Sequence, residues 1–178
     1  MGLLVKGEWS TDWYDTDSSG GEFIRTDAQF RNSIGDENYP AEAGRYHLFV
    51  SLACPWAHRT LIFRKLKKLE DIIGVTTVVP EMLEHGWVLS DEESLAHGYE
   101  ACPIEGIKYM YEVYTTCQSD YSGRVTVPTL WDKKTNTIVS NESSEIIRML
   151  NTAFNELTGD DKDYYPQDLR QEIDEVNE

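Results

Sequence analysis

One cysteine stands where a strand-like stretch of the sequence gives way to a helix-like one. Cys54 comes soon after the strand-like run at residues 46–50, and Pro55 after it suits the first turn of a helix. The first amide N–H groups and the positive end of the helix dipole converge at such a position, which favours a thiolate. This setting predicts a reactive thiol, with a buried structural cysteine as the alternative.

The residue three positions after Cys54 is Ala57 and not a second cysteine. Two cysteines at this spacing form an internal disulfide, whereas one thiol must resolve its covalent intermediate with a thiol from outside. The spacing therefore predicts glutathione chemistry. The remaining cysteines, Cys102 and Cys117, receive no role from the sequence.

The tetrapeptide Asn-Glu-Ser-Ser at residues 141–144 is typical of a helix start. Ser143 and the N–H groups of that helix can bind a carboxylate, and Glu142 can accept from an ammonium group. The γ-glutamyl end of glutathione carries both groups. Plain helix capping is the alternative for these residues.

Arg124 and Trp87 are two further binding candidates. A guanidinium clamps a carboxylate well, and an indole can lie against a ligand while its N–H donates. The ordinary alternatives are an exposed surface arginine and a tryptophan packed within its loop. The predicted first helix is basic on its polar side, and most of its basic side chains are expected to form a solvated face; these residues are Arg59, Arg64, Lys65, Lys67 and Lys68.

The elements that must position these residues follow from hydrophobic periodicity. The expected strands are residues 46–51, 75–79, 126–131 and 137–140, and the expected helices are residues 55–69, 107–116 and 143–156. The first two strands need a helical crossover and are parallel, whereas the last two are joined by a short hairpin loop and are antiparallel. The order β-α-β-α-β-β-α predicts an α/β protein with a thioredoxin-like fold.

Three segments make up the chain in this interpretation. Residues 1–45 form an N-terminal extension without clear periodicity, and residues 46–157 form the thioredoxin-like glutathione-binding domain. Residues 158–178 form a linker and the first helix of an otherwise absent all-helical domain. Within the thioredoxin-like domain, residues 80–105 are expected to be a polar loop or insertion.

A thioredoxin-like fold predicts a binding role for the dipeptide Val127-Pro128. In thioredoxin folds this peptide bond is typically cis, a form that proline makes accessible at about 0.5–1 kcal/mol. The backbone N–H and C=O of Val127 can then pair with the cysteinyl backbone of glutathione, as an added strand would. The alternative is an ordinary proline at the start of a strand.

The composition and net charge limit the classes of partner that we expect for this protein. The chain has 178 residues and a formal net charge of −16, so a nucleic-acid partner is not expected. There is no apolar run long enough to predict a membrane partner, and the histidines and cysteines show no metal-ligand spacing. Three cysteines without a disulfide framework favour a reducing compartment, most simply the cytoplasm.

With these residues in hand, the chain resembles the glutathionyl-hydroquinone reductases, the Xi class of the glutathione transferases, which are omega-like. The motifs that carry the resemblance are Phe23-Ile24-Arg25, Phe30-Arg31, residues 41–47, residues 51–59, Gly86-Trp87, residues 123–128 and Asn141-Glu142-Ser143. The resemblance implies that Cys54 is catalytic and that glutathione, as co-substrate, is held by Trp87, Arg124, Val127, Pro128, Glu142 and Ser143. It also implies quinone-type small molecules as substrates, and a homodimer or a complementing helical chain as partner.

The implied reaction is the reduction of a glutathionyl-hydroquinone to the hydroquinone through a mixed disulfide of Cys54 with glutathione, which releases glutathione disulfide. Two other interpretations stay open at this point. One is a glutaredoxin-like deglutathionylase or dehydroascorbate reductase, because a single thiol suits these reactions too. The other is a truncated, non-catalytic binding domain.

Overall fold

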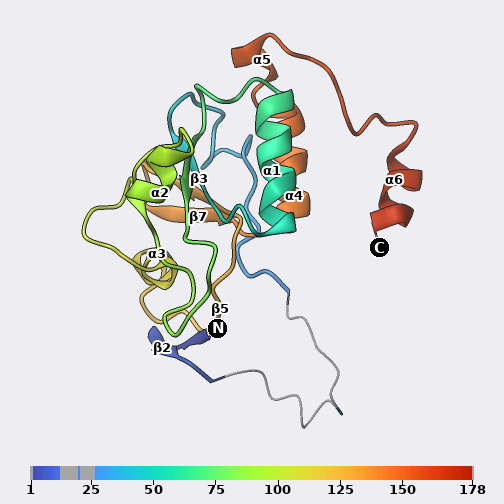
Figure 1. Ribbon diagram of the computed structural model, residues 1–178. Helices are drawn as coiled ribbons and strands as arrows, with labels where there is room; N and C mark the ends of the chain where they lie inside the picture. The colour runs from blue at the N-terminus through green and yellow to red at the C-terminus, as the bar shows by residue number, and fades with distance from the viewer. Residues whose placement is uncertain (1, 13–19, 21–26, 178) are drawn as a thin grey trace.

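A four-stranded sheet forms the centre of the protein (Figure 1). The computed structural model describes residues 2–12, 20 and 27–177. In the sheet, β3 (Tyr46–Val50) pairs in parallel with β4 (Gly74–Thr77) and antiparallel with β6 (Thr129–Asp132), and β6 pairs antiparallel with β7 (Thr137–Ser140). The predicted thioredoxin-like order is confirmed.

Helices cover both faces of this sheet. On one face lie α1 (Pro55–Leu66) and α4 (Ser143–Thr152), side by side in Figure 1, and on the other lie α2 (Asp91–Ala96) and α3 (Met110–Cys117). Strand β3 shows why two layers form, because its alternate side chains enter different cores. Leu48 packs into the core beneath α1 and α4, whereas Phe49 packs into the core beneath α3.

Helix α2 lies in the segment that we expected to be a polar loop or insertion. Its N-cap is Ser90, whose Oγ accepts from the backbone N–H of Glu93 at 3.1 Å. Its one buried residue is Ser94, whose hydroxyl is 3.1 Å from the Thr77 hydroxyl. The helix is thus anchored to β4 by hydrogen bonds rather than by an apolar stripe, which explains why the sequence pattern did not predict a helix at residues 91–96.

All three predicted helices differ in extent from the predictions, and the first of them, predicted over residues 55–69, ends at Leu66. The predicted helix at residues 107–116 begins at Met110, because the Glu112 carboxylate accepts from the N–H groups of Lys108 and Tyr109, both at 2.7 Å. The predicted helix at residues 143–156 is divided into α4 and a short α5 (Asn155–Thr158), which ends at Gly159 with φ of 65°.

A second, three-stranded sheet joins the N-terminus to the middle of the chain. Strand β1 (Leu3–Val5) pairs antiparallel with both β2 (Glu8–Ser10) and β5 (Gly123–Arg124). The Trp9 indole N–H donates to the Glu84 carbonyl at 3.0 Å. The N-terminal hairpin therefore contacts two segments that carry predicted binding residues, the loop before Trp87 and the strand of Arg124.

After α5, the chain passes the C-terminal end of α1 before it reaches α6 (Arg170–Asn177). The buried Lys67 ammonium donates to the carbonyl oxygens of Asp160 at 2.9 Å and Lys162 at 2.6 Å, which fixes this connection. Figure 1 shows α6 beside the body of the protein rather than within it. Within the described residues, no helix combines the length and the apolar character needed to span a bilayer.

Acid is expected to destabilise the fold through His47. This side chain is fully buried on β3, and burial lowers its pKa to about 3, helped by the charges of Lys133 and Arg64. The folded pKa lies below the unfolded value of about 6.5, so this contribution is complete above pH 6.5 and is lost at about 1.4 kcal/mol per pH unit below it.

Urea unfolding at pH 7 and pH 5 tests this prediction. The loss of unfolding free energy between the two pH values should be about 2 kcal/mol smaller in His47→Gln than in the wild type. Glutamine keeps a donor for Thr76, whose hydroxyl lies 2.8 Å from the His47 Nε2 atom. Equal losses in both proteins would contradict the role of His47.

Candidate functional site

Cys54 is the N-cap of α1, as the sequence predicted. Its backbone is extended, with φ of −98° and ψ of 117°, and Pro55 occupies the first helical position. The thiol donates to the carbonyl oxygen of Val127 at 3.5 Å. The Val127-Pro128 peptide bond is cis, in agreement with the prediction. The fold thus brings together a thiol and a backbone segment that lie 73 positions apart.

A cavity of about 330 Å³ lies beside this pair. Four of the predicted glutathione-binding residues line it: Arg124, Val127, Pro128 and Ser143. The other lining residues are Asp27, Ala28, Gln29, Trp56, Tyr121, Thr126 and Asn141. The cavity therefore lies between the N-terminal ends of α1 and α4 and the turn that precedes β6.

The floor of the cavity near α4 presents hydrogen-bonding groups. Ser143 is buried and is the first residue of α4. Glu142 is the N-cap, and its carboxylate accepts from the N–H of Ser144 at 3.1 Å and from the Ser144 hydroxyl at 3.0 Å. Glu142 therefore caps the helix, which was the alternative weighed for it. The proposed ammonium contact of Glu142 stays a prediction.

Arg124 is placed by the second sheet. Its carbonyl accepts from the Tyr121 hydroxyl at 3.1 Å, and its strand β5 pairs with Leu3 of the N-terminal hairpin. Gln29, which also lines the cavity, donates to the carbonyl of Ser122 at 2.9 Å. A guanidinium in this wall gives an acidic chain a local positive charge with which to bind a carboxylate.

Trp87 lies elsewhere. Its ring packs against the core beneath α3, and its carbonyl accepts from the Met110 N–H at 2.9 Å. It is not among the described residues that line the cavity. Its packing fits the ordinary alternative, and a contact between Trp87 and a ligand stays a prediction.

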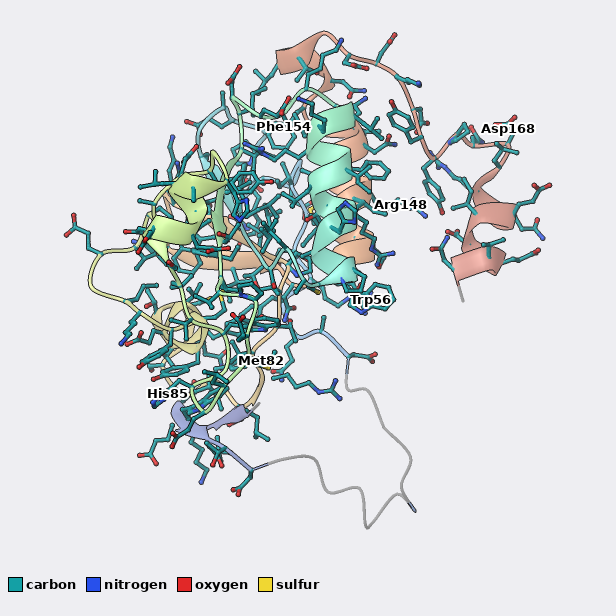
Figure 2. All side chains as sticks on the ribbon, viewed as in Figure 1. Trp56, Met82, His85, Arg148, Phe154 and Asp168 are labelled. Carbon is teal, nitrogen blue, oxygen red and sulfur yellow. The ribbon has the colours of Figure 1, made fainter. Side chains whose placement is uncertain are left out.

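Sequence reasoning missed several residues that line or border the cavity. Trp56 stands two positions after Cys54, is 49% exposed and projects at the N-terminal end of α1 (Figure 2). Asn141 accepts from the backbone N–H of Phe30 at 3.3 Å and so ties the N-terminal segment to the site. Only the closeness of Trp56 to Cys54 could have signalled its role; Asn141 acts through residues far away in the sequence.

Arg59 is the clearest correction among the basic residues. We expected most of the charged side chains of the first helix to form a solvated face. Instead, the Arg59 guanidinium donates to the Ser143 hydroxyl oxygen from Nε at 3.1 Å and from a terminal nitrogen at 2.7 Å. It connects the helix of the thiol to the floor of the cavity.

Metal chemistry receives no support from the described side chains. No group of three or more His, Cys, Asp or Glu residues among them is arranged to hold a metal ion. The motif Phe23-Ile24-Arg25 and part of the N-terminal extension lie outside the described residues.

Comparison with known proteins gives consistent matches. Residues 53–153 match the family described as "Glutathione S-transferase, N-terminal domain". The chain is 52% identical over 186 residues to the glutathionyl-hydroquinone reductase YqjG of Escherichia coli K12, and 49% identical over 179 residues to the glutathionyl-hydroquinone reductase PcpF of Sphingobium chlorophenolicum. These matches include 99% of this chain but 56% and 55% of the relatives, so the chain spans about half the length of these relatives.

Solved structures agree with these matches. The glutathione-bound structure of YqjG from Escherichia coli aligns with 99% of this chain and 52% of its own, with a TM-score of 0.81 and 46% identity. The glutathione S-transferase Xi of Phanerochaete chrysosporium aligns with 87% of this chain and 53% of its own, with a TM-score of 0.80 and 52% identity.

Proposed function

This chain belongs to the glutathione S-transferase family, and from that premise we propose that it is a glutathione-dependent thiol oxidoreductase that reduces glutathionyl-hydroquinones to hydroquinones. One observation carries the proposal: Cys54, without a second cysteine three residues later, is the N-cap of α1, and its Sγ lies 3.5 Å from the Val127 carbonyl oxygen beside a cavity lined by Arg124 and Ser143. The two glutathionyl-hydroquinone reductases that it resembles add the substrate class.

The first step breaks the thioether of the substrate. The Cys54 thiolate attacks the glutathione sulfur, so an S–S bond forms while the bond between sulfur and the ring carbon breaks. The electron pair of the broken bond stays on the ring carbon, which takes a proton from solvent. The hydroquinone leaves, and Cys54 remains joined to glutathione as a mixed disulfide.

The second step restores the thiolate. A second glutathione, as its thiolate, attacks the glutathione sulfur of the mixed disulfide, and glutathione disulfide leaves. The proton that this glutathione gives up balances the one taken by the ring carbon. Two glutathione sulfurs are oxidised to one disulfide, and the hydroquinone ring gains hydrogen in place of the glutathionyl group.

In our proposal, different protein groups bind the different parts of glutathione. Ser143 and Arg124 bind carboxylates, and the Val127 backbone beside Pro128 pairs with the cysteinyl residue. Glu142 receives the ammonium group, and Trp87 completes the set by resemblance to the family.

The free state of Cys54, Cys102 and Cys117 supports placing this chemistry in a reducing compartment, most simply the cytoplasm.

The test follows turnover of glutathionyl-menadiol with excess glutathione. We expect menadiol and glutathione disulfide to form in equal amounts. Dehydroascorbate and a small glutathione mixed disulfide serve as comparison substrates. Faster turnover of these two would favour the glutaredoxin-like alternative, whereas a folded protein that binds glutathione without turning over any of the three would favour the binding domain.

A further inference from the structure

Arg59 occupies a place that neither helix capping nor surface charge explains. It lies on α1, five residues after Cys54, and its side chain is 25% exposed. From there it reaches across to the first residue of α4, to which it makes two hydrogen bonds. α1 and α4 are therefore linked by a polar contact at the edge of the cavity.

The two hydrogen bonds decide the role of the Ser143 hydroxyl. A hydroxyl has one O–H to donate and two lone pairs that accept. The Arg59 Nε and a terminal nitrogen, at 3.1 Å and 2.7 Å from the Ser143 Oγ, occupy both lone pairs. Within the described part of the chain, that hydroxyl donates to no protein acceptor, and Ser143 lines the cavity. The O–H is thus left to donate to a ligand.

A donor fixed in this way suits an anionic acceptor. Two N–H groups of a cation withdraw electron density from the oxygen, so the O–H becomes a stronger donor. The Arg59 guanidinium also lies 3.7 Å from the Glu142 carboxylate and 5.1 Å from the ring centre of Trp56, which lines the same cavity. One side chain therefore contacts three residues around the site.

We propose that Arg59 is a positioning residue that holds the Ser143 hydroxyl as a donor to the γ-glutamyl carboxylate of glutathione. The inference rests on the proposed function, because glutathione is the ligand. Arg59 acts through Ser143, so its loss should weaken binding of the carboxylate while the chemistry at Cys54 persists. The expected kinetic signature is a higher KM for glutathione with a smaller change in kcat.

The test measures binding of S-methylated peptides, which form no disulfide with Cys54. Three probes separate the end groups: S-methylglutathione, its 4-aminobutyryl analogue without the γ-glutamyl carboxylate, and its glutaryl analogue without the amino group. Arg59→Met should weaken S-methylglutathione and the glutaryl analogue by about 10- to 100-fold, as expected for a hydrogen bond to a charged group. The 4-aminobutyryl analogue should bind the wild type and the variant equally well.

A double-mutant cycle with Ser143→Ala shows whether Arg59 acts through the hydroxyl. In the Ser143→Ala background, Arg59→Met should cause little further loss of affinity for S-methylglutathione. Arg59→Lys keeps the charge but not the planar pair of donors, so its affinity should fall between those of the wild type and Arg59→Met. Lys65→Met removes an exposed charge from the same helix, paired with Glu70, and should bind all probes as the wild type does.

Each outcome decides between the ideas. If Arg59→Met binds S-methylglutathione normally, loses affinity equally for all three probes, or adds its full loss to that of Ser143→Ala, the positioning role is refuted and the proposed function stands. If the folded wild type binds none of the probes, both are refuted. Melting temperatures identify any variant that fails to fold, and Arg59→Lys then supplies the comparison.

Discussion

Replacement of Cys54 by serine is expected to lower the rate of glutathionyl-hydroquinone reduction by at least about 1000-fold, as for loss of a catalytic nucleophile. A serine hydroxyl is a far weaker nucleophile than a thiolate, and it cannot form the disulfide on which the second step depends. The assay is release of menadiol from glutathionyl-menadiol. Mass spectrometry should also find one glutathione attached to the wild type, and none to Cys54→Ser, when the substrate is supplied alone.

The other two cysteines are matched controls. Burial raises the pKa of the Cys102 thiol and of the Cys117 thiol, so little of either is thiolate near neutral pH. Each is engaged locally: Cys102 donates to the Ile104 carbonyl at 3.5 Å, and Cys117 accepts from the Ile138 N–H at 3.3 Å. Cys102→Ser and Cys117→Ser should keep turnover within about twofold. A large loss in either, or activity remaining in Cys54→Ser, would contradict the assignment.

The second large effect is expected in stability, from the buried ion pair of Arg45 with Asp132. The Arg45 Nε donates to the carboxylate at 2.9 Å, and Asp132 also accepts from the Lys134 N–H at 2.9 Å and the Thr135 hydroxyl at 2.8 Å. The Asp132 side chain is fully buried. Asp132→Ala removes this carboxylate and leaves the buried guanidinium with the Asn38 carbonyl at 2.9 Å and the Glu42 carboxylate at 3.8 Å, so we expect a loss of about 3 kcal/mol of unfolding free energy.

Urea unfolding followed by tryptophan fluorescence measures this loss. Glu70→Ala is the control, because it breaks an exposed ion pair with Lys65, which we expect to contribute less than about 1 kcal/mol. Equal destabilisation by the two substitutions would show that the buried pair has no special role.

The pH dependence of the pair has a definite sign. Burial alone would raise the pKa of Asp132, but hydrogen bonds from Arg45, Lys134 and Thr135 outweigh burial and hold it below its usual value. The folded pKa is therefore below the unfolded value of about 3.9, so the contribution is complete above that pH and is lost as the pH falls through the folded pKa. In Asp132→Asn this part of the acid destabilisation should disappear.

The sequence by itself determined the order of the main elements and the position of the thiol. Strands β3 and β7 and the start of α1 were predicted because they depend on local signals, namely short apolar runs, a hairpin loop and a proline in the first helical turn. The cis bond before Pro128 also follows from one residue type in a known topology.

Tertiary structure decided the features that depend on partners far away in the chain. Helix α2 is anchored by the polar Ser94, and β1 pairs with a strand about 120 residues later. The sequence therefore shows no hydrophobic periodicity that would predict either element. The hydroxyl that Arg59 holds lies 84 positions away, and local spacing carries no trace of such a pair. Which polar side chains meet is decided by how the helices pack on the sheet, because hydrogen bonds depend on distance and angle in space rather than on order in the sequence.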